Sequence, residues 1–160
     1  MIKVKLITLG KLKEKYLREA VAEYLKRLSA YANAEIIELE PVRLPDNPSA
    51  LEIEKALSLE AEMIKKKIPD DALVTAMCIE GKQYSSEEFE KLLSGKINQG
   101  RGNLIFIIGS SYGLSEEIKK RADIKLSFSK MTFPHQLFRI MLMEQIYRSF
   151  KIAEGSKYHK

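Results

Sequence analysis

Apolar and polar positions along the chain follow two periods in turn, which predicts alternating strands and helices. Ile2, Val4 and Leu6 alternate with lysines, as in a half-buried strand, and apolar residues between Leu17 and Leu28 recur at helical spacing. The same two patterns continue to the end of the chain. Further strands are predicted at residues 35–40, 73–79, 104–108 and 124–128, and further helices at 53–68, 89–97, 115–121 and 137–152.

The order of these elements predicts an α/β fold. The strands at 73–79 and 104–108 are apolar on both faces, which is typical of parallel strands covered by helices on each side. Pro41, Pro45 and Pro48 mark the connection after the second strand as a loop. Neither a repeat nor a domain boundary is evident, so we expect residues 1–160 to form a single domain.

The composition is that of a globular protein, with 45% apolar and 31% charged residues. No apolar run approaches about 20 residues, and the start of the chain lacks the continuous apolar core of a signal peptide. We therefore expect no membrane span and a cytoplasmic location. Cys78, the single cysteine, lies in an apolar run, which predicts a buried thiol of low reactivity. With two histidines and one cysteine, no metal site is expected.

The net charge of +5 is distributed unevenly. Residues 1–118 contain 17 Lys and Arg against 19 Asp and Glu, whereas residues 119–160 contain ten against three. The excess positive charge therefore lies in the last quarter of the chain. It indicates an anionic partner, nucleic acid before others. The alternative is a solvated basic tail without a partner.

The helix predicted at 137–152 is apolar on nearly every side. A helix on a protein surface normally shows only one apolar stripe. One face of this helix can pack on the sheet, and the other needs a second cover. A symmetric partner chain is the simplest cover, so the pattern predicts a homodimer. Burial by the protein's own loops is the alternative.

The loop Gly109–Leu114 follows a parallel strand at the end where α/β sheets bind ligands. It is not a dinucleotide fingerprint, because G-x-G-x-x-G is absent, and it is not a P-loop. Glu116 and Glu117 occupy the first turn of the next predicted helix, where their carboxylates would repel a phosphate. The loop therefore favours a small ligand without phosphate.

The segment Ser127–Arg139 leads from the fifth strand into the last helix. Thr132 is predicted as its N-cap and Pro134 as part of its first turn, with His135 nearby. Such a loop can bind a small ligand through backbone groups. The ending Gly155–Lys160 combines an aromatic ring, an imidazole and two lysines, which can stack on a base and contact its phosphate. The alternative for this ending is a disordered terminus.

Four stretches together resemble a known family: Gly10–Tyr16, Gly109–Leu114, Leu126–Arg139 and Tyr158–Lys160. They resemble the bacterial ribosomal RNA large subunit methyltransferase H family, which belongs to the SPOUT class of α/β-knot methyltransferases. The resemblance runs the full length of the chain in the same order. It implies a parallel-rich sheet flanked by helices with a deep C-terminal trefoil knot, and a homodimer. It also implies S-adenosyl-L-methionine as cofactor and N3-methylation of a pseudouridine in 23S rRNA of the assembled ribosome.

By position, the resemblance implies that the cofactor contacts are made by Met77, Gly109, Phe128, Ser129, Lys130, Met131, Thr132 and Phe133. There is one departure, since family members usually have a second glycine where Ser110 stands. A serine is tolerated there unless the position needs a positive φ.

N3 of pseudouridine carries a proton, which must leave for a methyl group to be accepted. Candidate bases are His135 and His159, the latter reaching in from a partner chain. Arg139 and Arg148 are candidates for stabilising the negative charge on the base, and Tyr158 for stacking or orientation. Two alternatives remain open on these grounds: a knotted methyltransferase acting on transfer RNA, and a non-catalytic RNA-binding α/β module.

Overall fold

The computed structural model describes residues 1–158 and contains a five-stranded, all-parallel sheet with the strand order β2-β1-β4-β3-β5. The predicted alternation of strands and helices is confirmed. In chain order the elements are β1 (Lys3–Leu9), α1 (Lys15–Leu28), β2 (Asn33–Leu39), α2 (Ala50–Lys65), β3 (Leu73–Gln83), α3 (Ser86–Asn98), β4 (Asn103–Ile108), α4 (Glu116–Arg121), β5 (Ile124–Ser127) and α5 (His135–Ala153).

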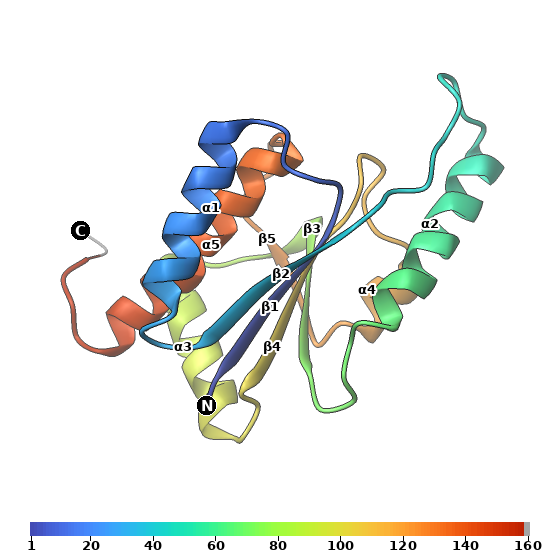
Figure 1. The fold of residues 1–160 in the computed structure, drawn as a ribbon. Helices are drawn as coiled ribbons and strands as arrows, with labels where there is room; N and C mark the ends of the chain where they lie inside the picture. The colour runs from blue at the N-terminus through green and yellow to red at the C-terminus, as the bar shows by residue number, and fades with distance from the viewer. Residues whose placement is uncertain (159–160) are drawn as a thin grey trace.

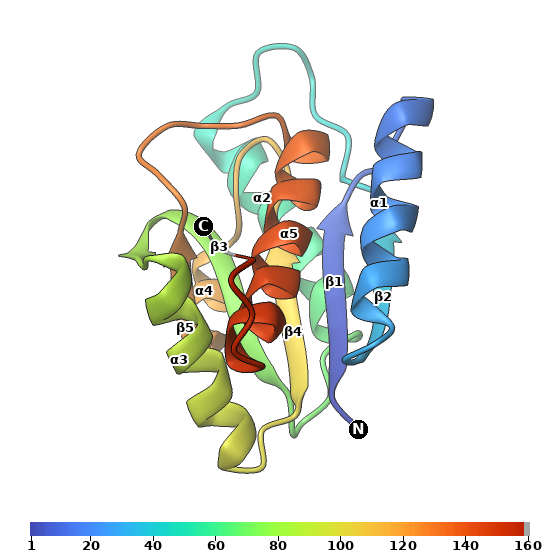
Figure 2. The same ribbon diagram turned by 90° about the vertical axis from the view of Figure 1, so that its left-hand side faces the viewer.

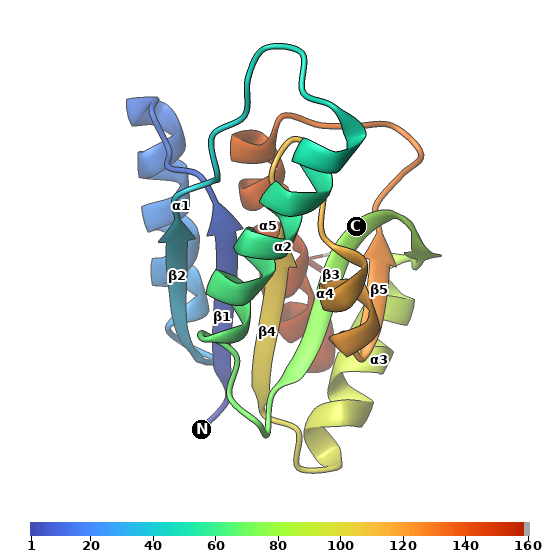
Figure 3. The ribbon, with the colours of Figure 1, turned by 90° about the vertical axis from the view of Figure 1, so that its right-hand side faces the viewer.

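Helices cover both faces of the sheet (Figure 1). On one face α5 lies between α1 and α3, as Figure 2 shows, and on the other α2 and α4 lie against the strands, as Figure 3 shows. Each layer has its own apolar core. Leu6 and Phe106 face the first layer, whereas Ile7 and Ile105 face the second. The central strands therefore bury both faces, as their sequences predicted.

Three of the five helices, α2, α3 and α4, have a serine side-chain cap, whereas α1 and α5 have no side-chain cap hydrogen bond. Ser49, Ser85 and Ser115 cap α2, α3 and α4 through their hydroxyls, and Ser115 was predicted to do so. The prediction that Thr132 caps the last helix is wrong: Pro134 is the N-cap of α5 and makes no side-chain bond. The N-cap lies two residues later than predicted, because the residue before a proline is disfavoured in the helical region, so Phe133 cannot begin the helix.

Strand β3 contains a bulge that the sequence did not predict. Met77 and Lys82 both pair with Leu126 of β5, so the four residues between them are displaced from the ladder. Gly81 lies so close to β5 that a Cβ there would approach the Leu126 nitrogen to 2.8 Å. Cys78 is consequently half-buried rather than a core residue, which corrects the prediction of a buried thiol.

Helix α5 obtains its cover largely from its own chain. Between residues 138 and 152 none of its side chains is exposed, because α1, α3 and the C-terminal segment pack around it. The alternative of burial within the chain therefore explains most of its apolarity. Leu137, at 44% exposure, is the large apolar side chain of α5 that remains uncovered.

The segment after α5 folds back onto the helix. Gly155, with φ of +82°, ends α5, and the Ser156 amide donates to the Lys151 carbonyl, as in a Schellman motif. Tyr158 then donates to the Glu144 carboxylate at 3.2 Å, and its ring packs edge-on against Tyr147. The Tyr158 ring is therefore partly buried against α5. His159 and Lys160 lie outside the described residues.

Candidate functional site

The candidate site lies at the carboxyl ends of β3, β4 and β5. The loop after β4 leads to α4 on one face of the sheet, whereas the loop after β5 leads to α5 on the opposite face. Loops that diverge in this way leave a crevice between them, which is where open α/β sheets bind ligands. An open pocket of about 410 Å³ occupies this crevice.

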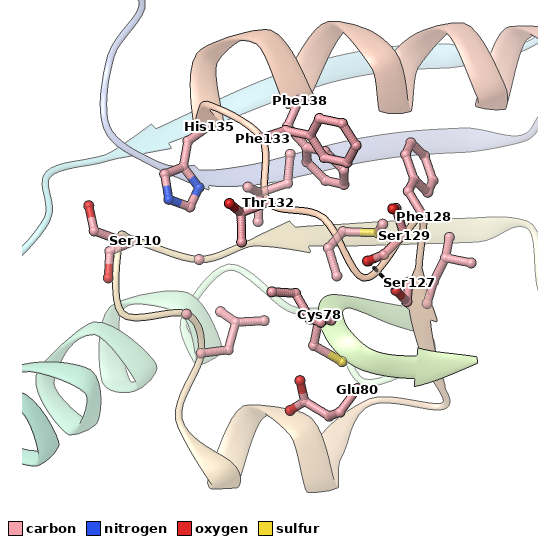
Figure 4. A pocket seen from close by; sticks show the side chains of 18 of the residues that line it. Cys78, Glu80, Ser110, Ser127, Phe128, Ser129, Thr132, Phe133, His135 and Phe138 are labelled. Carbon is pink, nitrogen blue, oxygen red and sulfur yellow. Dashed lines mark hydrogen bonds between the residues drawn. The ribbon is translucent and has the colours of Figure 1, made fainter. Parts of the chain in front are cut away.

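The pocket brings together most of the residues that the sequence predicted for cofactor binding (Figure 4). Seven of the eight predicted positions line it: Met77, Gly109, Phe128, Ser129, Met131, Thr132 and Phe133. Lys130, the eighth, is exposed and does not belong to the pocket lining. His135, a candidate base, also lines the pocket and lies at the same end as Ser110.

Gly109 is required by the shape of its own loop. The Gly113 amide donates to the Ser110 carbonyl at 2.8 Å, which closes a tight turn, and Gly113 has a φ of +83°. A Cβ on Gly109 would lie 2.3 Å from the Gly113 carbonyl oxygen. No residue other than glycine therefore fits at position 109 without displacing the pocket wall.

Ser110 occupies a conformation that serine readily adopts, since no non-glycine residue in the described part of the chain has a positive φ. Its hydroxyl donates to the carboxylate of Glu60 on α2 at 2.9 Å. Glu60 is only 4% exposed and also accepts from the Val42 amide at 3.0 Å. One buried carboxylate thus joins the pocket loop to the loop after β2, a contact that sequence reasoning missed.

The loop after β5 is held by short local bonds and by aromatic packing. The Ser127 hydroxyl donates to the Ser129 carbonyl, and the Met131 amide donates to the Ser129 hydroxyl at 3.0 Å. The rings of Phe128 and Phe133 pack on Phe138 of α5, with centroids 4.9 and 6.1 Å apart. The loop presents one apolar wall and several backbone groups, which suits a ligand that is partly aromatic and partly polar.

The bulge in β3 forms the wall opposite His135, and its residues were not predicted as site residues. Cys78 and Glu80 line the pocket there, together with Lys119 of α4. Glu80 forms an ion pair with Lys119, and this hydrogen bond lowers the pKa of Glu80 and raises that of Lys119. Burial is the main reason that the pKa of the Cys78 thiol is raised, so the thiolate is disfavoured. The sequence could have indicated Cys78 and Glu80 as site residues only through their position at the carboxyl end of a central strand.

His135 is the first residue of α5 and is exposed overall. Partial desolvation by the surrounding protein disfavours the charged imidazolium and lowers the pKa of His135 below its ordinary value of 6.5. The imidazole is therefore neutral at neutral pH. A neutral imidazole at a pocket wall can accept a proton from a bound group.

Arg139 and Tyr158 do not lie at the pocket of their own chain. Arg139 is 3% exposed and forms an ion pair with Glu38 at 2.7 Å, while it also donates to the Gly10 carbonyl. Tyr158 contacts α5 at Glu144, nine residues beyond His135, which is roughly 14 Å along a helix axis. Arg148 pairs with the same Glu144. The catalytic roles expected for these residues stay predictions.

Within residues 1–158, no group of three or more His, Cys, Asp or Glu side chains is arranged to hold a metal ion. None of the helices within these residues has the length and apolarity needed to span a membrane.

Comparison with known proteins assigns the class. A family model described as "Predicted SPOUT methyltransferase" matches residues 2–159, and the chain belongs to this family of methyltransferases. Curated relatives carry the name Ribosomal RNA large subunit methyltransferase H. The chain is 50% identical to those of Streptococcus gordonii and Carboxydothermus hydrogenoformans over 99% of this chain and 100% of theirs. It is 52% identical to that of Bacillus thuringiensis subsp. konkukian over 98% of this chain and 99% of that one.

A solved structure supports the fold alone. The chain is similar, with a TM-score of 0.53 and 13% identity, to a probable methylase family protein from Haemophilus influenzae Rd KW20. The match covers 100% of this chain and 72% of that chain. The family assignment thus agrees with an α/β fold whose pocket lies at the strand ends.

Proposed function

We propose that the chain uses S-adenosyl-L-methionine to methylate N3 of a pseudouridine in 23S rRNA of the assembled ribosome. The observation that carries this proposal is one pocket that collects seven of the eight positions expected to contact the cofactor. The names of relatives at about 50% identity supply the ribosomal RNA substrate.

The pocket fits the proposed cofactor in size and in chemistry. Its volume of about 410 Å³ lies within the range of small-molecule sites. Phe128, Leu114 and Leu126 offer apolar surface for an adenine ring, and the turn at Gly109 brings backbone groups close to the ligand. The neighbouring helix α4 has its N-terminus capped by Ser115 and two glutamates in its first turn, which suits a ligand without phosphate.

The bound cofactor would supply an electrophilic methyl group, and the protein must orient the base and remove its proton. His135 is the candidate base of the described residues, because its imidazole is neutral and lines the pocket. The loop at 127–133 would hold the cofactor and exclude water. His159 remains a second candidate base, reaching the pocket of a partner chain.

We further propose that residues 1–160 form one domain with a C-terminal knot, as the SPOUT resemblance implies. We also propose that two copies of the chain form a homodimer. Support for a dimer comes from large apolar side chains exposed near the pocket mouth, namely Tyr112, Met131 and Leu137. Sedimentation of the purified protein at micromolar concentration should show a dimer, and Leu137→Glu should dissociate it; a wild-type monomer would contradict the proposal.

A single comparison tests the activity. Purified protein is incubated with methyl-labelled S-adenosyl-L-methionine and with ribosomes, free 23S rRNA or transfer RNA. Methyl transfer to ribosomes, mapped to N3 of a pseudouridine, is the expected result. Transfer to transfer RNA alone would favour the other knotted class, and cofactor binding without transfer to any RNA would contradict the proposal.

A further inference from the structure

We propose that the exposed loop between β1 and α1, residues 10–14, together with Lys15 at the start of α1, is a phosphate-contact surface for the RNA substrate. This inference rests on the proposed function, which supplies RNA as the partner, and it adds a location that neither the family match nor the names of relatives assign. This surface carries Lys11, Lys13 and Lys15, all of them exposed, and Glu14 as its one carboxylate.

Fewer Lys and Arg side chains in the last quarter of the chain are free to contact RNA than their number suggested. Within residues 119–158, five of the nine Lys and Arg side chains form ion pairs: Lys119, Arg121, Arg139, Arg148 and Lys151. Charges already paired within the protein contribute less to counterion release on RNA than free ones do. The last quarter of the chain therefore supplies fewer free cations than its charge count indicated, and free cations elsewhere near the site become relevant to RNA binding.

Lys11 and Lys13 are such cations, because neither forms an ion pair with any described residue, whereas Lys15 pairs weakly with Glu19 at 3.6 Å. Tyr16, 67% exposed, follows directly and adds an aromatic ring to the same surface. Exposed aromatic rings beside cations are typical of surfaces that bind single-stranded nucleic acid.

Hydrogen bonds hold the backbone of this loop at almost every residue, although most of its side chains are exposed. Gly10, with φ of +118°, turns the chain after β1, and its carbonyl accepts from Arg139 at 3.1 Å. The Leu12 amide donates to Glu38, and the Lys13 carbonyl accepts from Arg18 at 2.8 Å. A loop fixed in this way presents its lysines without a large loss of backbone entropy on binding.

The same bonds tie the loop to the pocket. The Lys13 amide donates to the side chain of Gln136 at 3.1 Å, and Gln136 directly follows His135. Arg139, one turn further along α5, spans to Gly10 and Glu38. In Figure 1 the loop lies beside the start of α5. It follows the carboxyl end of β1, and the pocket lies at the carboxyl ends of β3, β4 and β5 in the same parallel sheet. Phosphates bound here would flank a base placed against His135.

The Arg139–Glu38 pair, in which Arg139 is buried and Glu38 is exposed, supports a positional role for this junction. Desolvation of the arginine offsets much of its attraction to the carboxylate, so the pair adds little net stability. Moreover, Nε of Arg139 is buried without a hydrogen-bond partner. Since the pair secures an exposed lysine loop rather than a core element, its effect is to fix where that loop stands relative to α5.

The test is the double variant Lys11→Gln/Lys13→Gln, compared with Lys55→Gln/Lys66→Gln, two exposed lysines associated with α2 on the opposite face of the sheet. The measurement is kcat/KM for methylation of purified ribosomes between 50 and 200 mM salt at constant Mg²⁺. The loop variant should show a lower kcat/KM, and its salt slope should be shallower by about 0.7 to 0.9 for each phosphate that is no longer neutralised. Its kcat at saturating ribosomes and its affinity for S-adenosyl-L-methionine should be unchanged.

The inference is overturned if the loop variant keeps the wild-type salt slope, or if the control variant shows an equal decrease in kcat/KM. It is also overturned if the loop variant loses affinity for S-adenosyl-L-methionine, because the lysines would then act on the pocket rather than on RNA. Failure of the wild-type protein to methylate any RNA would instead contradict the proposed function, so the two failures are distinguishable.

Discussion

The hydroxyl of Ser110 donates a 2.9 Å hydrogen bond to the Glu60 carboxylate, and this bond joins the wall of the pocket to helix α2. Glu60 is almost fully buried and is also the acceptor for the Val42 amide. The position of the pocket loop therefore depends on a side chain that does not itself line the pocket. A glycine at position 110 would lack this bond, so the serine of this chain gives its loop an additional fixed point.

Removal of the Ser110 hydroxyl should loosen the loop without unfolding the protein. We expect Ser110→Ala to weaken binding of S-adenosyl-L-methionine roughly fivefold, which corresponds to about 1 kcal/mol for one hydrogen bond. Titration calorimetry measures the affinity, and thermal unfolding checks the fold. Ser58→Ala, at an exposed position of the same helix as Glu60, is the control and should change neither. Equal affinities for Ser110→Ala and wild type would show that the bond does not shape the site.

Gly109→Ala should have a larger effect on the site than on stability. Its Cβ would meet the Gly113 carbonyl at 2.3 Å, so the turn must move and binding of S-adenosyl-L-methionine should fall below detection. The control is Gly95→Ala in α3, where a Cβ would meet nothing within 4 Å. That change should leave binding intact and stabilise the helix by roughly 0.5 to 1 kcal/mol. Calorimetry and circular dichroism of the two variants provide the comparison, and normal binding by Gly109→Ala would place the cofactor elsewhere.

Removal of Arg139 and removal of Glu38 should lower the free energy of unfolding by different amounts. The Arg139 side chain is 4% exposed and that of Glu38 is 35% exposed, so loss of Glu38 leaves the more deeply buried charge unpaired. We expect Glu38→Ala to lower the free energy of unfolding by about 3 kcal/mol and Arg139→Met by less. Urea denaturation measures both. A larger loss for Arg139→Met would mean that its packing, rather than its charge, dominates.

The rate of methylation should depend on pH through His135. Partial burial lowers its pKa below 6.5, so the neutral base persists to more acid pH than in a free histidine. The rate should therefore rise with pH through a window below 6.5 and then level off. The unfolded chain binds this proton more readily than the folded chain, so the contribution of His135 to stability falls as the pH falls through 6.5.

The pH profile of single-turnover methylation tests the role of His135. His135→Gln should remove the acid limb and lower the rate by about 100-fold, within the usual range for loss of a general base. His159→Gln is the parallel variant. An acid limb that survives in His135→Gln and disappears in His159→Gln would assign the base to the tail.

Local patterns of apolar residues, together with cap and turn residues, were sufficient to place all ten elements, because strands and helices bury their side chains with different periods. The resemblance of Gly109 and the loop 128–133 to a known family also pointed to residues that line the pocket. These features are local, since they depend on neighbours in the chain. The excess of positive charge in residues 119–160 was likewise visible in the sequence, but the ion pairs that these side chains form were not.

Only the tertiary structure decided contacts between residues far apart in the chain. The bulge that turns Cys78 from a core residue into a pocket residue depends on how β3 meets β5, and the Glu60–Ser110 bond joins residues 50 positions apart. The cover of α5 by α1 and α3, and the return of Tyr158 onto Glu144, depend in the same way on packing. Side-chain type sets what a residue can bind, but the register of strands and the packing of helices set which partner it meets.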